Sequence, residues 1–278
     1  MRGSLAGRRV FVTGAASGIG RATALLCGRM GAELFLTDLR DLTAVAEEIG
    51  GAVRYAKSAD IADFDQVRRM AEEIHAAAGP MDVVMNIAGI SAWGTVQTLE
   101  HRHWRSMVEV NLMGPIHVIE SFVPAMIAAG RGGHLVNVSS AAGLLGLPWH
   151  AAYSAAKFGL RGVSEVLRFD LRRHGIAVTL VCPGGVDTPL TDTVEIAGVD
   201  QRDERFRRLQ ARFRRRAATP ERVAATIVRG MLRRRYLVHT ATDVRLAHLA
   251  ERLVPPLYAA IMRGMNRTMT RALQRQAR

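Results

Sequence analysis

Residues 10–20 read VFVTGAASGIG, and this stretch decides the fold. Its apolar, β-branched start predicts a buried strand, and the glycines behind it lead directly into a helical pattern. In such a unit Gly14 permits a tight turn, Gly18 lets the backbone approach a pyrophosphate, and Gly20 allows the helix to pack closely. Free N–H groups at the helix start favour an anion there. The stretch therefore predicts a dinucleotide-binding strand, turn and helix; a plain loop of small residues is the alternative.

The alternation of strand and helix continues along the chain. Strands that alternate with helices form a parallel sheet covered on both faces. We therefore predict an α/β fold with a doubly wound, seven-stranded parallel sheet, a Rossmann fold, and a C-terminal helical extension. The predicted strands are 10–13, 33–37, 52–56, 82–85, 134–138, 176–181 and 236–239, and the predicted helices include 19–30, 63–78, 99–129, 151–174, 243–254 and 257–274.

Charge divides the chain into two parts. Its 278 residues suit one sizeable domain, and their net charge is +13. Residues 1–201 carry 18 basic and 20 acidic side chains, whereas residues 202–278 carry 20 arginines and five acidic residues. The basicity therefore belongs to an appendage of a nearly neutral body. We place one α/β domain at 1–242 and a basic helical extension at 243–278.

Cysteine use and the N-terminal segment bear on the compartment. Cys27 and Cys182 lie in apolar runs, which is typical of buried, reduced thiols and not of a disulfide framework. The segment before the first strand lacks the apolar stretch of a signal peptide, and no uninterrupted apolar run is long enough to span a bilayer. We expect a cytoplasmic protein.

The second predicted strand ends near an acidic residue that suits a ribose. Asp38 follows the glycine stretch by about 20 residues, the distance at which a carboxylate accepts hydrogen bonds from the adenosine ribose of NAD. A 2′-phosphate would be repelled there, and the glycine stretch contains no Arg or Lys. Arg40, however, is a cation close enough to tolerate NADP. The sequence favours NAD and leaves NADP open.

The wide glycine spacing, Gly-x3-Gly-x-Gly, resembles the single-domain short-chain dehydrogenase/reductase family. The resemblance extends from residue 8 to about residue 240, because further segments match the family's pattern in order. These segments are Asp60 with Ile61 after the third strand, Asn86-Ile87-Ala88-Gly89 after the fourth, and Pro183-Gly184 followed by Thr188 after the sixth.

The resemblance implies roles for these segments. Asp60 would contact the adenine, residues 86–89 would support the sheet and the cofactor, and Thr188 would hold the nicotinamide carboxamide. Read alone, Asp60 is equally a helix cap and Asn86 a turn residue. The implied cofactor site comprises Gly14, Ser17, Gly18, Ile19, Gly20, Asp38, Asp60, Ile61, Asn86, Ala88, Gly89, Tyr153, Lys157, Pro183, Gly184, Val186 and Thr188.

A tyrosine and a lysine lie four residues apart in a predicted helix. This spacing places Tyr153 and Lys157 on one helix face. The ordinary pKa of tyrosine is about 10, so a nearby ammonium that favours the phenolate would make Tyr153 a usable general base. Chance produces such pairs, but the ordered family segments around this one favour catalysis. The resemblance implies interconversion of an alcohol with a ketone or aldehyde, with Lys157 also binding ribose.

Two serines follow the predicted strand 134–138. Adjacent strand residues face opposite sides, so only one hydroxyl points at the cleft at the carboxyl end of the sheet. The family's spacing selects Ser140, which would orient the substrate oxygen, and leaves Ser139 structural. Asn111 matches the family's fourth catalytic residue, which implies that it holds a water linking Lys157 to solvent. Read alone, Asn111 is a helix-bending or capping amide that needs a partner.

Other residues bear on the substrate and on metals. His101 and His103 lack Cys or carboxylate ligands at site-forming spacing, so we interpret them as a solvated helix start and predict no metal. Apolar residues in loops after the strands would line a pocket for a lipophilic small molecule. The predicted pocket residues are Trp93, Leu144, Leu145, Trp149 and Leu190.

The last predicted helix is amphipathic and basic. Such a helix can lie on an anionic membrane, pack across a subunit interface, or cover its own domain, and all three stay open. The arginines of 205–216 fall where the family carries a mobile substrate lid and can add to the same positive face. The apolar row is Leu257, Ile261, Met265, Met269 and Leu273, and the basic row is Arg263, Arg267, Arg271 and Arg275.

Two other functions remain as alternatives. A cofactor-sensing regulator or scaffold on this fold could touch a membrane or nucleic acid through its arginines. The set of Asn111, Ser140, Tyr153 and Lys157 argues against it, so a nucleic-acid partner is not expected. The wide glycine spacing argues against an epimerase or dehydratase. The family pairs its long helices, which implies a homodimer or homotetramer.

Overall fold

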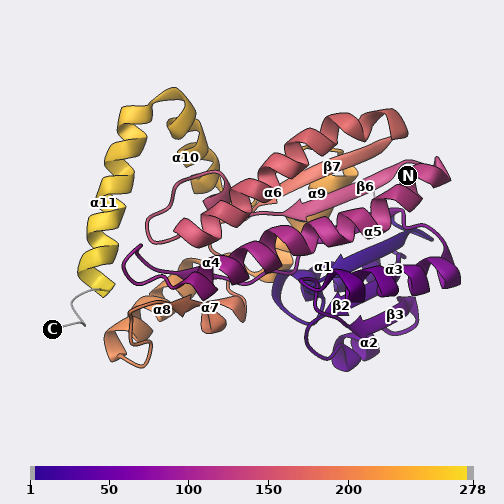
Figure 1. Cartoon of the computed structure of the whole chain (residues 1–278), viewed down its shortest axis with the longest axis horizontal. Helices are drawn as coiled ribbons and strands as arrows, with labels where there is room; N and C mark the ends of the chain where they lie inside the picture. The colour runs from indigo at the N-terminus through magenta and orange to yellow at the C-terminus, as the bar shows by residue number, and fades with distance from the viewer. Residues whose placement is uncertain (1–3, 274–278) are drawn as a thin grey trace.

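A parallel sheet forms the centre of the molecule (Figure 1). The computed structural model describes residues 4–273, apart from the side chains of Arg205, Leu209 and Leu273. Within them, seven strands pair in parallel in the order β3-β2-β1-β4-β6-β7-β9, which confirms the predicted doubly wound sheet. The strands are β1 (Arg9–Thr13), β2 (Glu33–Asp38), β3 (Val53–Ser58), β4 (Val83–Asn86), β6 (Gly133–Val138), β7 (Ile176–Cys182) and β9 (Leu237–His239).

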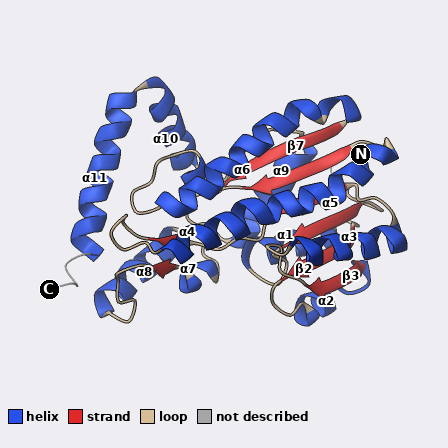
Figure 2. Ribbon diagram, viewed as in Figure 1, coloured by secondary structure: helices blue, strands red, loops and turns tan. Residues whose placement is uncertain are grey.

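Helices cover both faces of this sheet (Figure 2). The helices of the described chain, some of which lie outside these two layers, are in chain order α1 (Gly18–Arg29), α2 (Thr43–Ile49), α3 (Phe64–Ala78), α4 (His101–Val108), α5 (Gly114–Ala129), α6 (Ala151–Asp170), α7 (Leu190–Thr193), α8 (Glu204–Arg216), α9 (Pro220–Leu232), α10 (Thr242–Leu253) and α11 (Pro255–Leu273). Val10 and Val12 of β1 join the core that α1, α2 and α9 cover, whereas Phe11 joins the core under α3 and α5. Alternate residues of one strand therefore serve both layers.

The strand order opens a crevice at one edge of the sheet. β1 pairs with β2 on one side and with β4 on the other, so the connections after β1 and β4 turn to opposite faces. Ligands of such sheets bind outside the carboxyl ends of the strands at this switch point. The glycine stretch and residues 86–89 follow β1 and β4 and therefore meet there.

One long helical stretch differs in detail from the prediction. His101–Ala129 is long and apolar enough, by length and composition, to cross a membrane, which the sequence reading did not foresee. Val118, Phe122 and Met126 are buried against the sheet, as in the core helix of a globular domain. A π-helical turn, Glu109–Met113, separates α4 from α5 within this stretch. Both cysteines are buried and unpaired, as predicted.

A small second sheet was not predicted. β5 (Ala92–Trp93) pairs in parallel with β8 (Glu195–Ile196). His103 is buried, and its Nε2 lies 2.9 Å from Oε1 of Glu195, while Nδ1 accepts a hydrogen bond from the backbone of Glu100. The interpretation of this helix start as solvated was therefore wrong for His103. The helix start instead fastens α4 to the small sheet.

The C-terminal extension forms a helical hairpin, α10 followed by α11, at one end of the molecule (Figure 1). Val244 of α10 is buried beside Leu144 and Leu145. The Tyr258 hydroxyl accepts a hydrogen bond of 2.8 Å from the backbone N–H of Gly146, and Met269 packs on the apolar cluster around Trp149. The extension thus contacts its own domain. Gln274 and Arg275, which we placed in the last helix and its basic row, lie outside the described residues.

Candidate active site

Three elements bring the predicted catalytic residues together. Ser140 begins the loop after β6, Tyr153 and Lys157 lie in the first two turns of α6, and Asn111 lies in the π-helical turn. α6 packs on the 3-10 turn that follows Ser140 and on the π-helical turn. All four residues therefore stand at the carboxyl edge of the sheet, within the switch-point crevice.

The two serines divide as the alternation of a strand requires. Ser139 is buried, and its hydroxyl donates a hydrogen bond of 2.9 Å to the backbone carbonyl of Lys157. Ser140 Oγ accepts a hydrogen bond from the N–H of Ala142 and also bonds the hydroxyl of Tyr153. Ser139 thus holds α6 against β6, and Ser140 is the hydroxyl that reaches the tyrosine.

Burial governs the ionisation of Tyr153 and Lys157. Desolvation raises the pKa of Tyr153 to about 12, against a smaller lowering by the hydrogen bond with Ser140. Desolvation also lowers the pKa of Lys157 to about 8. The Nζ atom of Lys157 lies 5.7 Å from the centre of the Tyr153 ring and donates to the carbonyl of Val138 at 3.1 Å.

These shifts run against the sequence expectation for the cofactor-free chain. We expected the Lys157 ammonium to lower the pKa of Tyr153, but loss of water around the phenol dominates and raises it, and the lowering contribution comes from Ser140. Tyr153 is therefore a protonated phenol at neutral pH. In this state it can donate a proton, and acting as a base requires additional positive charge at the site.

Asn111 is a fully buried amide, and its hydrogen-bond partners belong to the fold itself. Its Nδ2 donates to the carbonyl of Ile90 at 3.0 Å, and its Oδ1 accepts from the N–H of Ile90 at 3.2 Å. Nδ2 also lies 3.6 Å from the sulfur of Met107. The side chain therefore fastens the loop after β4 to the π-helical turn. The water-holding role implied by the resemblance stays a prediction.

The glycine stretch forms a close-fitting turn in which a side chain at Gly14 or Gly18 would crowd its neighbours. We call this turn the cradle. Gly14 and Gly18 have φ of 70° and 52°, in the left-handed region that favours glycine. A Cβ at Gly14 would lie 2.8 Å from Cα of Ala88, and one at Gly18 would lie 3.1 Å from Cγ2 of Thr188. The cradle thus fits a pyrophosphate approached closely by backbone, with Thr188 directly beside it.

Asp38 stands at the end of β2 beside this cradle. Its carboxylate accepts hydrogen bonds from the N–H of Ala16 at 3.0 Å and from the N–H of Arg40 at 2.9 Å. The guanidinium of Arg40 hydrogen-bonds Ser17 Oγ and lies 3.5 Å from Oδ1 of Asp38. A carboxylate and a cation therefore share the position where an adenosine ribose would lie.

The other predicted cofactor residues have structural contacts of their own. Asp60 accepts from the N–H of Ala62, whereas the cap of α3 is Asp63 and not Asp60. Asn86 is the last residue of β4, not a turn residue, and its amide donates to Asn137 at 2.9 Å. The remaining ones divide between the core, the loops after β4 and β7, and the start of α1; they are Ile61, Ala88, Gly89, Pro183, Gly184, Val186, Ile19 and Gly20.

The predicted pocket residues do not form one lining. Leu144 and Leu145 are buried in the cluster that includes Val244 of α10, so their side chains stabilise the hairpin contact. Trp149 is buried too, in a cluster near α8, with a φ of 67° that is unusual for a residue with a side chain. Trp93 and Leu190 are half-buried. Leu144 and Leu145 also pack with Leu180 of β7, so their role as lining residues stays a prediction.

Sequence reasoning missed His150, which lies next to the tyrosine. Its ring centre is 4.5 Å from that of Trp93 and 6.4 Å from that of Tyr153. Nδ1 donates to the carbonyl of Pro148 at 2.6 Å, and burial lowers the pKa of His150, so the ring is neutral with Nε2 as an acceptor. The only signal in the sequence was a histidine three residues before Tyr153, just ahead of the helix.

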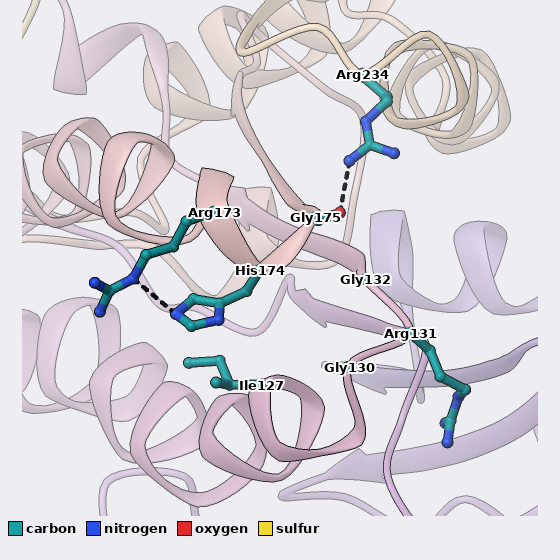
Figure 3. A pocket seen from close by; sticks show the side chains of 8 residues that line it. All are labelled: Ile127, Gly130, Arg131, Gly132, Arg173, His174, Gly175 and Arg234. Atoms are coloured by element: carbon teal, nitrogen blue, oxygen red, sulfur yellow. Dashed lines mark hydrogen bonds between the residues drawn. The ribbon is translucent and has the colours of Figure 1, made fainter.

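An open cleft of about 530 Å³ lies away from these residues (Figure 3). Its lining comes from the loops at the amino ends of β6 and β7. Arg173 donates to His174, and Arg234 donates to the carbonyl of Gly175, so two of its cations already have partners. None of the predicted catalytic residues lines it. The chemistry belongs to the opposite edge of the sheet.

Comparisons with known proteins identify the family to which the chain belongs. A family profile described as short chain dehydrogenase matches residues 8–197. SadH, described as an oxidoreductase, from Mycobacterium tuberculosis (strain ATCC 25618 / H37Rv), is 34% identical over 269 residues, which cover 93% of this chain and 95% of SadH.

Two solved structures are similar throughout. A short chain dehydrogenase/reductase from Burkholderia phymatum in complex with NAD has a TM-score of 0.77 and 27% identity, covering 90% of this chain and 96% of that one. A protein from Beutenbergia cavernae, described as an NAD(P)-dependent gluconate 5-dehydrogenase with bound NADP at low occupancy, has a TM-score of 0.76 and 31% identity, covering 87% and 98%.

Proposed function

Because the chain belongs to the short-chain dehydrogenase family, we propose that it is an NAD-dependent oxidoreductase that interconverts a secondary or primary alcohol and its ketone or aldehyde. One observation carries the proposal. Ser140, Tyr153 and Lys157 meet at the carboxyl edge of the sheet, beside a cradle that only glycine can form.

The residues of the chain supply binding and proton transfer. When bound, the nicotinamide cofactor supplies the hydride donor for reduction or the acceptor for oxidation. Ser140 donates a hydrogen bond to the substrate oxygen, and Tyr153 gives that oxygen a proton in reduction or removes one in oxidation. Lys157 binds the ribose and stabilises the phenolate. Asn111 holds the loop after β4 in place and completes the proton path from Lys157.

The ribose position supports NAD over NADP. Asp38 presents a carboxylate that would repel a 2′-phosphate, and Arg40 offsets part of that charge from 3.5 Å. We expect Asp38→Ser to lower the preference for NAD over NADP in kcat/KM about tenfold or more, because a charge-assisted hydrogen bond is lost. Asp41→Ser, a change at an exposed carboxylate nearby, is the matched control.

A lipophilic substrate suits the residues around Tyr153. Trp93 offers an aromatic face, Trp149 stands in an apolar cluster with Phe206, and His150 is the nearest additional polar ring. Leu190 lies at the start of α7, close behind Thr188. We infer that the apolar body of the substrate packs on these residues, and that Nε2 of His150 accepts one hydrogen bond from a hydroxyl of the substrate.

Location and oligomeric state are also part of the proposed function. We infer a cytoplasmic homodimer or homotetramer with peripheral contact to an anionic membrane. The exposed apolar side chains of Phe158, Val166 and Phe169 on α6 support pairing of this long helix with a second copy.

To test this function, the absorbance of the reduced cofactor is measured over time with four classes of candidate substrate: steroids, retinoids, fatty-acyl ketones and simple polyols. We expect turnover with an apolar ketone or alcohol, faster with NAD(H) than with NADP(H). Binding of NAD without turnover of any of these classes would instead favour a cofactor-sensing protein. Preference for polyols would contradict the lipophilic substrate alone.

A further inference from the structure

The α10–α11 hairpin carries an apolar ridge on its outside. In most soluble monomers, large apolar side chains are exposed singly and not in a continuous row. Here they recur every three or four residues along both helices and across the apex, and each is at least 39% exposed. The ridge comprises Leu246, Leu249, Leu253, Val254, Leu257, Ile261 and Met265.

Other residues of the hairpin make its contacts with the domain. Val244 and His248 are the buried residues of α10, and they lie on the helix face opposite Leu246 and Leu253. On α11 the contacts with the domain come from Tyr258 and Met269. The ridge is therefore left over after the hairpin has packed on its own domain.

Charge favours a lipid bilayer as the occupant of this ridge. Within 242–273 there are five arginines and two acidic residues, and the acidic residues Asp243 and Glu251 both lie on α10. The arginines are exposed, and no ion pair is recorded for them within the part of the chain that the structure describes. Apolar side chains flanked by cations are typical of helices at an anionic membrane surface. The arginines are Arg245, Arg252, Arg263, Arg267 and Arg271.

The same charges disfavour a second copy of the chain. A two-fold interface pairs a surface with itself, so the ridge of one copy would bring its arginines against those of the other. Like charges placed against each other weaken an interface. An anionic bilayer offers apolar depth and opposite charge together.

We propose that the α10–α11 hairpin docks on an anionic bilayer, with the apolar ridge at the boundary of headgroups and acyl chains and the arginines at the phosphates. This specifies the surface behind the peripheral contact in the proposed function. Tyr258 bonds Gly146 in the loop that precedes His150, so the docked hairpin stands beside the substrate site (Figure 1). A lipophilic substrate could then reach the site from the bilayer.

Vesicle sedimentation of the full chain tests the proposal. Vesicles of phosphatidylcholine alone are compared with vesicles in which part of it is replaced by phosphatidylglycerol, at low and high salt. We expect binding to the anionic vesicles that weakens with salt, because salt screens charges at the surface. Binding of neither kind of vesicle at low salt would overturn the proposal.

Two sets of variants separate apolar insertion from charge. Leu253→Ser with Leu257→Ser should weaken binding about tenfold or more. Arg263→Gln with Arg267→Gln and Arg271→Gln should weaken it about a hundredfold, at about tenfold or less per arginine. Matched controls lie elsewhere on the surface: Val96→Ser is an exposed apolar change, and the triple change of Arg172, Arg233 and Arg235 to Gln removes equal charge. Equal loss in the controls would overturn the assignment to the hairpin.

Measuring the oligomeric state tests the alternative that a second copy of the chain covers the ridge. Light scattering should give the same mass for the wild type and for Leu253→Ser with Leu257→Ser. An assembly that dissociates only in this variant would show that a second copy covers the ridge and would overturn membrane docking. Vesicle binding does not require turnover, so Tyr153→Phe should bind like the wild type. If the wild type turns over no member of the substrate panel but binds anionic vesicles, the proposed function is contradicted and docking stands.

Discussion

At the carboxyl edge of the sheet polar side chains are buried, whereas in the α10–α11 hairpin apolar side chains are exposed. Lys157 is 3% exposed, and Leu253 is 74% exposed. Burying polar groups and exposing apolar side chains both lower the stability of a folded chain, so each arrangement indicates a function. The first removes water from groups that move protons, and the second holds apolar surface ready for a partner. Catalysis and location therefore depend on separate parts of this molecule, so substitutions should affect one without the other.

Replacing the catalytic tyrosine should reduce activity more than any other change proposed below. Tyr153→Phe removes the hydroxyl that bonds Ser140 and leaves the ring in place. We expect kcat to fall about a hundredfold to ten-thousandfold, the usual contribution of a positioned general acid or base. Initial rates and NAD binding should be measured together. Full turnover in the variant would remove Tyr153 from the mechanism.

The second prediction concerns the buried charge of Lys157. Its pKa is about 8 in the folded chain and about 10.4 when unfolded. Below about pH 8 both states are protonated and the folded chain bears the full desolvation cost. As pH rises from about 8 to about 10.4, the folded chain loses its proton first, so this cost disappears.

Lys157→Met isolates that change. The free energy of unfolding of the wild type should rise relative to the variant by on the order of 3 kcal/mol across this pH window. Urea titrations at a series of pH values measure it. Using the difference between the two proteins cancels groups that do not interact with Lys157, such as the buried thiol of Cys27. A constant difference would mean that Lys157 keeps its water.

A smaller loss of stability is expected for a glycine substitution beside the catalytic residues. A Cβ at Gly89 would lie 2.7 Å from Oδ1 of Asn111 and 3.5 Å from Nζ of Lys157. Gly89→Ala should therefore destabilise the chain by about 1–3 kcal/mol, the usual range for overpacking, and lower turnover. Thermal unfolding and initial rates measure both. Unchanged stability and turnover would show that Asn111 can move without consequence.

The smallest predicted effect has the opposite sign. A Cβ at Gly264, in the interior of α11, would meet nothing within 4 Å. Gly264→Ala should stabilise the helix by about 0.5–1 kcal/mol, because alanine loses less backbone freedom on folding. Thermal unfolding measures it, and turnover should not change. Altered turnover would mean that the hairpin and the site are not separate.

The sequence predicted the strands because their pattern is local: β1 is buried on both faces, so it reads as a short apolar run. The catalytic set was predicted differently. Helical spacing only placed Tyr153 and Lys157 on one face, and the ordered segments of the family resemblance selected them. α8 was not predicted as a helix, because arginines dominate its sequence and its few apolar residues, such as Phe206 and Phe213, are easily overlooked despite their helical spacing.

Contacts between segments that are distant in the chain could not be predicted from the sequence. Leu144 and Leu145 read as loop residues open to a pocket, and their packing with Val244, about a hundred positions later, was not predicted. His150 became part of the site only when β5 placed Trp93 against its ring. The pKa of Tyr153 likewise depends on burial, which the spacing to Lys157 does not report.

The π-helical turn at Glu109–Met113 changes the direction in which side chains point between α4 and α5. A π turn closes its hydrogen bonds one residue later than an α turn, so side chains after it are rotated by about 100° from where an unbroken α-helix would place them. α4 directs Met107 toward α6, while α5 directs Phe122 into the core under the sheet. Removing one residue from the turn would bring the halves into a common register and force one of them off its partner. The helix thus belongs to two layers of the molecule, and Asn111 lies at the seam between them.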